Sequence, residues 1–228
     1  MEYLQQALFV LMAISAIYLF AKKVGEIRRN IFLGKALDLS DNAAIRWKNL
    51  LLLAMGQKKM FKNIPVALMH FIIYAGFIII NIEVLEIVLD GILGTHRLFL
   101  PLLGGIYNWL INIFEVLALG VLVVCVLFLA RRNWLKLKRL VSKDLNGWPK
   151  TDANFILITE IILMSLFLIM NATDQLLQQN GTEHYAATGS FSISSLLMPL
   201  FEGFSNSTLI GIERAAWWIH IAGIFAFL

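Results

Sequence analysis

The sequence predicts an all-α integral membrane protein, folded as a five-helix transmembrane bundle. Hydrophobic residues make up 59% of the 228 positions and charged residues 15%, whereas soluble domains average about 25% charged residues. Several apolar runs also reach the ~20 residues that a helix needs to cross ~30 Å of hydrocarbon. A soluble chain of this size could not hide so much apolar surface in one core, so we expect the chain to lie in a lipid bilayer.

The five expected spans follow from the apolar runs, taken in chain order. They cover about residues 3–21, 65–89, 106–130, 154–170 and 210–228. Asn63 is placed to cap the second span, because Pro65 falls in its first turn, where a missing N–H costs nothing. Asp152 or Asn154 is placed to cap the fourth. The fifth run is still apolar at Leu228, so we expect the natural polypeptide to continue beyond this residue.

Lysine and arginine set the expected orientation of the spans. Of the nineteen basic residues, ten lie in segment 22–64 and seven in segment 131–153, which leaves Arg97 and Arg214. Segment 171–210 carries none. Because short cytoplasmic loops are enriched in basic residues, we expect the N-terminus outside and the C-terminus toward the cytoplasm, in the cytoplasmic (inner) membrane. The net charge of +4 thus reflects topology, and no basic face suited to nucleic acid is expected.

Two stretches between the spans are amphipathic. Residues 46–61 combine a short apolar run with flanking charges and aromatic rings, and residues 194–204 have a similar character without basic residues. Such segments suit helices that lie along a membrane surface. We expect the first at the inner surface and the second at the outer surface.

The single cysteine, Cys125, limits the redox chemistry of the chain. One cysteine cannot form an intrachain disulfide, and a cysteine-ligated iron–sulfur cluster typically takes four thiolates. We therefore expect no iron–sulfur cluster within this chain, so that any such centre belongs to another domain or subunit.

His70 and His220 are the two histidines within expected spans. Neutral imidazole is the usual axial ligand of haem b, and small and aromatic residues near both histidines suit a flat macrocycle. The alternative is a histidine that is hydrogen-bonded to a neighbouring helix. His70 lies about five residues into a span that starts inside, or ~8 Å deep, whereas His220 lies in the outer half. The two histidines are therefore expected at different levels, each with another partner.

Carboxyl groups within spans are the other candidates for chemistry. They are Glu83, Glu86, Glu115 and Glu160. Carboxyls buried in membranes often relay protons or bind polar ligands. The structural alternative is capping, pairing with Arg97 or Arg214, or a helix end that emerges among the lipid headgroups. We favour this alternative for Glu83 and Glu86. His96 and His184 fall in outer loops, where a solvated surface position is the simpler interpretation.

Short motifs along the chain resemble two related families. The strings LMHFIIYAGF (68–77) and WWIHIAGIFAFL (217–228) resemble the haem-ligand helices of the haem-b membrane subunit, the gamma subunit, of respiratory nitrate reductase. GQKKMFK (56–62), INIEVLEIVLDG (80–91) and GTHR (94–97) are similar to the membrane anchors of heterodisulfide-reductase-like iron–sulfur oxidoreductases. The resemblance extends over essentially the whole chain, 1–228.

The resemblance implies specific haem ligands. The nitrate-reductase subunit carries two haems between its second and fifth helices; His70 matches the inner histidine of the second and His220 the outer histidine of the fifth. The outer position on the second helix is Ile80, which cannot ligate iron. The inner position on the fifth helix would fall beyond Leu228. The resemblance thus implies one or two haems b. At the outer haem this chain departs from the family, because Ile80 replaces a histidine ligand.

The sequence therefore predicts a cytochrome b domain that transfers electrons between a membrane quinone pool and a cytoplasmic iron–sulfur domain, fused beyond residue 228 or on a separate subunit. His70 and His220 are the expected ligands of the haem iron. Glu115, Arg97 and His96 are the residues expected to take part in quinone binding and proton exchange, at or near the outer face. The alternatives are a haem-free membrane anchor for an iron–sulfur oxidoreductase and a transporter, which the odd number of spans and the lack of an inverted repeat disfavour.

Overall fold

The computed structural model describes residues 2–35, 41–57, 61, 63–137, 140 and 147–227. Within these residues the chain is helical and has no strand. Five helices are long and apolar enough to span a membrane: α1 (Glu2–Phe32), α3 (Ile64–Leu93), α5 (Gly105–Asn133), α6 (Trp148–Gln179) and α7 (Asn206–Ala226). This confirms the predicted fold class. Short helices and turns join them: α2 (Ala43–Asn49), η1 (Leu50–Met55), α4 (Leu100–Leu103), η5 (Ser194–Leu196) and η6 (Met198–Leu200).

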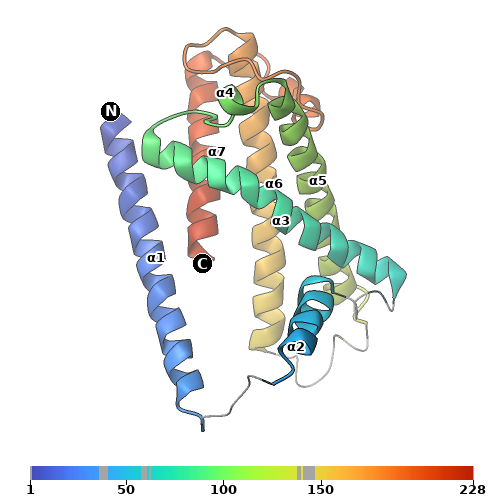
Figure 1. The fold of residues 1–228 in the computed structure, drawn as a ribbon. Coiled ribbons are helices and arrows are strands. Elements are labelled where there is room, and N and C mark those ends of the chain that lie inside the picture. Colours follow the sequence, from blue (N-terminus) through green and yellow to red (C-terminus); the bar gives the residue numbers. More distant parts are fainter. Residues whose placement is uncertain are drawn as a thin grey trace.

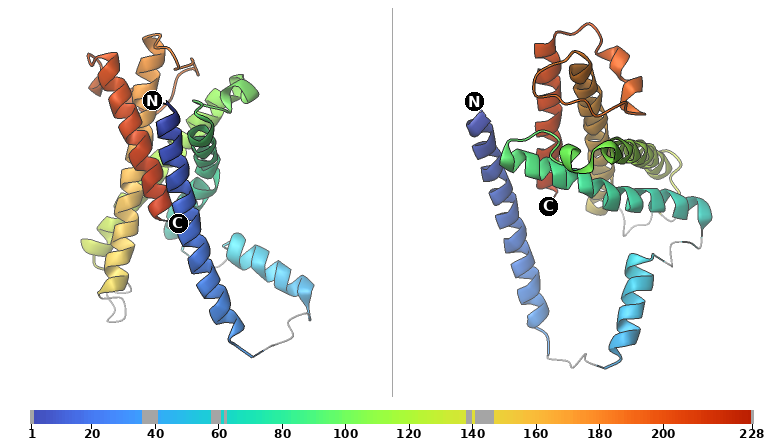
Figure 2. Two further views of the ribbon diagram at one scale, coloured as in Figure 1. Left: turned by 90° about the vertical axis from the view of Figure 1, so that its left-hand side faces the viewer. Right: turned by 45° about the horizontal axis from the view of Figure 1, so that its top comes forward.

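The five long helices run alternately up and down the bundle. In Figure 1, α1, α5 and α7 descend, α6 ascends, and α3 rises obliquely across the front of α6 and α7. The N-terminus and the connections 94–104 and 180–205 therefore lie at the top, and α2 lies at the bottom (Figures 1 and 2). The basic ends of α1 and α5 share the bottom end. The charge separation read from the sequence is thus present in the fold, and the side that faces the cytoplasm stays a prediction.

The core lies where α3, α5, α6 and α7 meet. Its fully buried side chains include Ile111, Phe114, Phe167 and Ile221. Gly76 of α3 faces α5, and a Cβ atom there would lie 2.6 Å from Val121 Cγ2. Small residues allow close helix contact in membranes, where van der Waals packing replaces the hydrophobic effect between helices.

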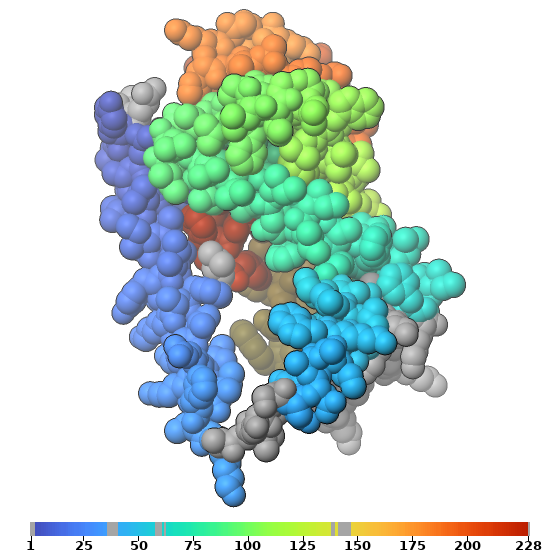
Figure 3. All heavy atoms as spheres, in the orientation of Figure 1, coloured from blue at the N-terminus to red at the C-terminus, as the bar shows by residue number. Residues whose placement is uncertain are grey.

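Helix α1 is attached to the bundle through its upper half. Phe9 is 1% exposed and its ring lies 5.5 Å from Trp217, 6.3 Å from Trp218 and 5.9 Å from Phe225. Its ring also covers Gly91 of α3. The lower half of α1 is exposed and stands away from the other helices, as Figure 3 shows.

The predicted helix caps were right at one end and wrong at another. Asn63 caps α3, because its side chain accepts a hydrogen bond of 3.5 Å from the backbone N–H of Val66. Helix α6, however, is preceded by Gly147 and already includes both Asp152 and Asn154. Helix α6 begins at Trp148, with Pro149 in its first turn, so it starts before both residues and neither caps its N-terminus.

Two other boundaries differ from the prediction. Helix α6 continues past the predicted end at residue 170 as far as Gln179, because its polar side chains there are buried and hydrogen-bonded within the protein. The stretch 194–204, predicted as an outer surface helix, contains two short 3₁₀ turns instead. Pro199 lies within the second turn and supplies no N–H to an α-helix. The stretch 46–61 is helical and exposed as far as Met55, as predicted.

We expect Gly76→Ala to lower the free energy of unfolding by about 1–3 kcal/mol, the usual cost of overpacking. The added Cβ would meet the stiff side chain of Val121. The measurement is thermal unfolding in detergent micelles, followed by circular dichroism. Gly25→Ala on α1 is the matched control, since nothing lies within 4 Å of a Cβ at that position. Equal stability of the two variants would show that α3 and α5 are not tightly packed at Gly76.

Candidate functional site

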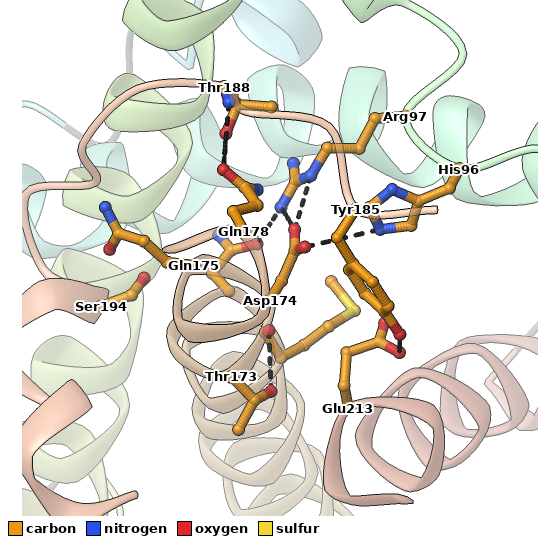
Figure 4. A network of polar contacts seen from close by, with 12 residues as sticks. His96, Arg97, Thr173, Asp174, Gln175, Gln178, Tyr185, Thr188, Ser194 and Glu213 are labelled. Carbon is orange, nitrogen blue, oxygen red and sulfur yellow. Dashed lines mark hydrogen bonds and ion pairs between the residues drawn. The ribbon is translucent and has the colours of Figure 1, made fainter. Parts of the chain in front are cut away.

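A buried arginine organises the upper end of the bundle. Arg97, in the connection after α3, is 6% exposed. Its Nε donates to Asp174 Oδ2 at 2.7 Å, and its Nη2 donates to the same oxygen. Nη1 donates to the Tyr107 hydroxyl at 3.1 Å and Nη2 to Asn171 Oδ1 at 3.1 Å. Burial disfavours the charged guanidinium, but Asp174 outweighs burial and holds the pKa of Arg97 well above its usual range. Figure 4 shows the ion pair.

Asp90 shapes the loop that presents Arg97. Helix α3 ends at Gly94, whose φ of +72° is the left-handed conformation common after helices. Asp90 Oδ1 then accepts hydrogen bonds from Thr95 Oγ1 (2.5 Å) and Leu98 N (3.2 Å), and Oδ2 accepts one from Arg97 N (2.9 Å). Arg97 itself has φ +56°, which costs a non-glycine residue about 1 kcal/mol or more. The Asp90 hydrogen bonds hold this strained residue in place.

The network extends from Arg97 into α3 and α5. The Tyr107 hydroxyl donates to Glu86 Oε2 at 2.7 Å, and Glu86 Oε1 accepts a hydrogen bond from Phe99 N at 2.7 Å. Asn171 Nδ2 donates to Glu115 Oε1 at 3.1 Å. Hydrogen bonds thereby join α3, α5 and α6 at their upper ends.

Glu115 anchors the outer loop to α5. Its side chain is fully buried and accepts hydrogen bonds from Ile193 N (2.8 Å), Ser194 N (3.1 Å) and Ser194 Oγ. This is the capping alternative that the sequence left open. Glu115 also does not line either of the two cavities described below. The position of Glu115 therefore does not support the prediction that this residue takes part in quinone binding.

An acidic cavity of about 380 Å³ lies beside the Arg97 network. We call it the acidic cavity, because its charged lining residues are Glu83, Glu86, Asp90, Arg97, Asp174, Glu183, Glu213 and Arg214. Phe9, Trp217 and Trp218 form an aromatic part of its wall. Among the described residues, buried atoms of three lining side chains have no hydrogen-bond partner: Glu83 Oε2, His96 Nδ1 and Asp174 Oδ1. Buried polar atoms are nearly always paired, so their grouping here indicates a site for a polar ligand.

His96 lies between the Arg97 network and the outer loop. Its Nε2 is 3.7 Å from Asp174 Oδ1, and its ring lies 5.5 Å from the ring of His184 and 5.0 Å from that of Tyr185. Burial lowers the pKa of His96 to about 4, although Asp174 opposes the shift. The imidazole is therefore neutral near pH 7. The Tyr185 hydroxyl in turn donates to Glu213 Oε2 at 3.2 Å, which links the loop to α7.

A second cavity, of about 290 Å³, lies lower in the bundle around His220. We call it the His220 cavity; Gly76 and Ile80 of α3 also line it, together with Glu160 and Met164 of α6. His220 is 2% exposed, and its Nδ1 lies 2.9 Å from the carbonyl oxygen of Leu163. A carbonyl only accepts, so Nδ1 carries the proton and Nε2 keeps its lone pair. Nε2 makes no hydrogen bond to the described part of the chain. Metal-ligating histidines are oriented in this way.

His70 is separate from the His220 cavity. Its ring lies 4.7 Å from that of Phe128 on α5, and its side chain is exposed at the surface of the bundle. It precedes Gly76 by six residues, or about 9 Å along α3 at 1.5 Å per residue. The structure therefore does not bring His70 and His220 into one site, in agreement with their different expected depths. Haem ligation by either histidine stays a prediction.

The two cavities follow one another along the bundle axis. On α7, Trp217 lines the acidic cavity and His220 the other, a rise of about 4.5 Å. On α6 the corresponding residues are Met170 and Met164, about 9 Å apart along the axis. The two cavities are therefore neighbours along the bundle.

Sequence reasoning missed Asp174, Tyr107 and Asn171. The expected fourth span ends at residue 170, so segment 171–178 falls outside it. One signal was available: Asn171, Asp174, Gln175 and Gln178 have the spacing of a single helical face, which continues α6 beyond its apolar run.

The fold and the two cavities define a polytopic helical membrane protein with a buried charged site at one end. The chain is similar to the probable iron–sulfur-binding oxidoreductase FadF of Bacillus subtilis (strain 168), with 23% identity over 221 residues, or 97% of this chain. The chain spans 29% of the length of that relative. No protein-family model and no solved structure matches it. The similarity and the membrane-spanning helices together support a general role as a membrane anchor or in electron transfer.

We expect Arg97→Gln to lower the free energy of unfolding by about 3–5 kcal/mol, because it leaves the buried carboxylate of Asp174 without its counter-charge. Thermal unfolding in detergent measures the loss. The control is Lys23→Gln, which removes an exposed pair with Glu26 and should cost less than about 1 kcal/mol. Similar losses in the two variants would contradict the central position given to Arg97.

The stability of the protein should also fall at low pH through His96. The pKa of His96 is about 4 in the folded chain and about 6.5 when unfolded. Between these two pH values His96 is protonated in the unfolded chain and neutral in the folded chain. The free energy of unfolding is therefore highest above pH 6.5 and decreases toward pH 4, by up to about 1.4 kcal/mol per pH unit. Unfolding of the wild type and His96→Gln from pH 4 to 8 measures this difference. Parallel curves would rule out the effect.

Proposed function

We propose that this chain is a cytochrome b-type membrane domain that carries electrons between a membrane quinone pool and an iron–sulfur partner on the cytoplasmic side. The observation that carries the proposal is the state of His220. It is buried beside an apolar cavity, its Nδ1 is held by Leu163, and its Nε2 remains available to a metal. The relative's name, an iron–sulfur-binding oxidoreductase, supports a redox partner.

The residues around His220 fit a haem that the His220 imidazole would hold. Haem b, when bound, supplies reversible one-electron transfer. The hydrogen bond from Nδ1 to Leu163 O fixes the imidazole ring and its tautomer, and Ile80 and Gly76 provide apolar walls that exclude water. Ile80 stands where the resembling family has its second histidine. Met164 and Glu160 line the same cavity and would help His220 to hold the group.

The acidic cavity is the proposed quinone site. A quinone head group is an aromatic-sized ring with two oxygens, and the cavity combines the aromatic wall of Phe9, Trp217 and Trp218 with buried polar atoms that lack partners. Its position next to the His220 cavity would allow direct electron exchange. His70, which lies toward the basic end of the bundle, is the proposed ligand of a second haem that carries electrons onward.

The test is a reduced-minus-oxidised visible spectrum, with chemical haem determination, of membranes that contain the protein with its natural partners. His220→Ala should lose the haem held at this position, and His70→Ala a second haem if one is bound. Both variants should still insert into the membrane, because each removes one side chain and leaves the apolar length of the spanning helix unchanged.

The control is His184→Asn, which alters an exposed histidine of the outer loop and should keep all haem. Unchanged haem content in His220→Ala would overturn the assignment of this ligand. An absence of haem from well-folded wild-type protein would instead leave a haem-free membrane anchor for an iron–sulfur oxidoreductase.

A further inference from the structure

The position of His96 suggests acid–base chemistry in the acidic cavity. Nε2 of His96 is 3.7 Å from Asp174 Oδ1, beyond hydrogen-bond distance, while the second carboxylate oxygen is held by Arg97. Hydrogen bonds between catalytic groups are often long without ligand and shorten when a proton is transferred. Arg97 therefore fixes one carboxylate oxygen of Asp174, and the other oxygen is placed to accept a hydrogen bond from His96.

We propose that His96, oriented by Asp174, is the group that exchanges a proton with a quinone head group in the acidic cavity. The proposal rests on the proposed quinone site and names the residue that performs its proton chemistry. The observation behind it is that His96 Nδ1, Asp174 Oδ1 and Glu83 Oε2 are buried, lack hydrogen-bond partners among the described residues, and belong to side chains that line one cavity.

The proton transfers balance in the direction of quinol oxidation. The O–H bond of one hydroxyl breaks and its proton bonds to His96 Nδ1, while Asp174 Oδ1 stabilises the charge that appears at Nε2–H. The second hydroxyl passes its proton to Glu83 Oε2. The two electrons would be taken up one at a time by a haem, if His220 holds one in the neighbouring cavity. Reduction of a quinone uses the same transfers in reverse.

The surroundings of His96 suit a neutral base. Positive charge comes from Arg97 in its own loop and Arg214 on α7, and negative charge from Asp174 on α6. From the outer loop, His184 and Tyr185 face the ring. Glu83, Glu86 and Asp90 of α3 and Glu183 and Glu213 line the same cavity. Helix α1 contributes the uncharged side chains Gln5, Gln6 and Phe9. Burial keeps the pKa of His96 near 4, so the free base is present across the physiological range.

The experiment measures the rate at which menadiol reduces the haem of the complete protein between pH 4 and 8. Dithionite, which needs no quinol site, gives the total reducible haem. In the wild type the rate should rise with pH as His96 loses its proton, and then level off. In His96→Gln this rise should disappear and the rate at pH 7 should fall by 10²-fold or more, the usual contribution of a general base. Menadione binding, measured by quenching of tryptophan fluorescence, should change little, because glutamine keeps a polar side chain in the cavity.

His184→Asn is the matched control, since it removes the other imidazole that faces the cavity, and asparagine tolerates the φ of +83° at this position. It should keep the wild-type pH profile. Asp174→Asn should slow the rate on its own and add little to His96→Gln, because two residues that act as a unit are not additive.

The outcomes separate this inference from the proposed function. No haem, or no binding of menadione by the wild type, would defeat the proposed function itself. Haem that menadiol reduces equally fast in His96→Gln, with an unchanged pH profile, would overturn the inference alone and assign the three buried atoms to water. Loss of the pH profile in His184→Asn only would also overturn it, by moving the proton exchange to His184.

Discussion

The upper end of this bundle depends on the burial of one positive charge. An arginine in a largely apolar protein is stable only when its donors and its charge are both satisfied within the structure. Arg97 meets this requirement with Asp174, Asn171 and Tyr107, which come from α5 and α6. The helices must therefore extend far enough to supply these groups. This is why α6 remains helical through residues that are too polar for the interior of a bilayer.

The network has a satisfied side and an unsatisfied side. Glu115 and Glu86 have their oxygens bonded to backbone N–H groups and neighbouring side chains, and these residues hold the loops in place. Three of the buried atoms that lack partners among the described residues belong to side chains of the acidic cavity: Glu83, His96 and Asp174. Asp174 belongs to both sides, since one oxygen binds Arg97 and the other faces His96. The same carboxylate thus links the stability of the outer end to its proposed chemistry.

The two cavities share helices, so their relation is built into the fold. Helices α3, α6 and α7 each contribute consecutive turns to the acidic cavity and then to the His220 cavity. A group bound in one is positioned relative to the other by rigid helices and not by loops. Helix α1 contributes to this arrangement only through its upper half, where Phe9 covers α3 and α7. Its exposed lower half leaves the other end of the bundle open, as Figure 3 shows.

The sequence by itself determined the membrane class, the five helices, the cap at Asn63 and the charge separation along the bundle, because these depend on composition and local pattern. The sequence also predicted that His70 and His220 lie at different depths in the membrane, since depth along a spanning helix follows from residue number. Only the tertiary structure decided which polar residues meet. Asp174 lies 77 positions after Arg97 in the chain, and no periodicity connects residues at that distance. Likewise Glu115 anchors the outer loop because the backbone of residues 193–194 packs against it. His96 is buried because residues 184–185 of the outer loop lie against its ring. Both arrangements depend on how the helices cross.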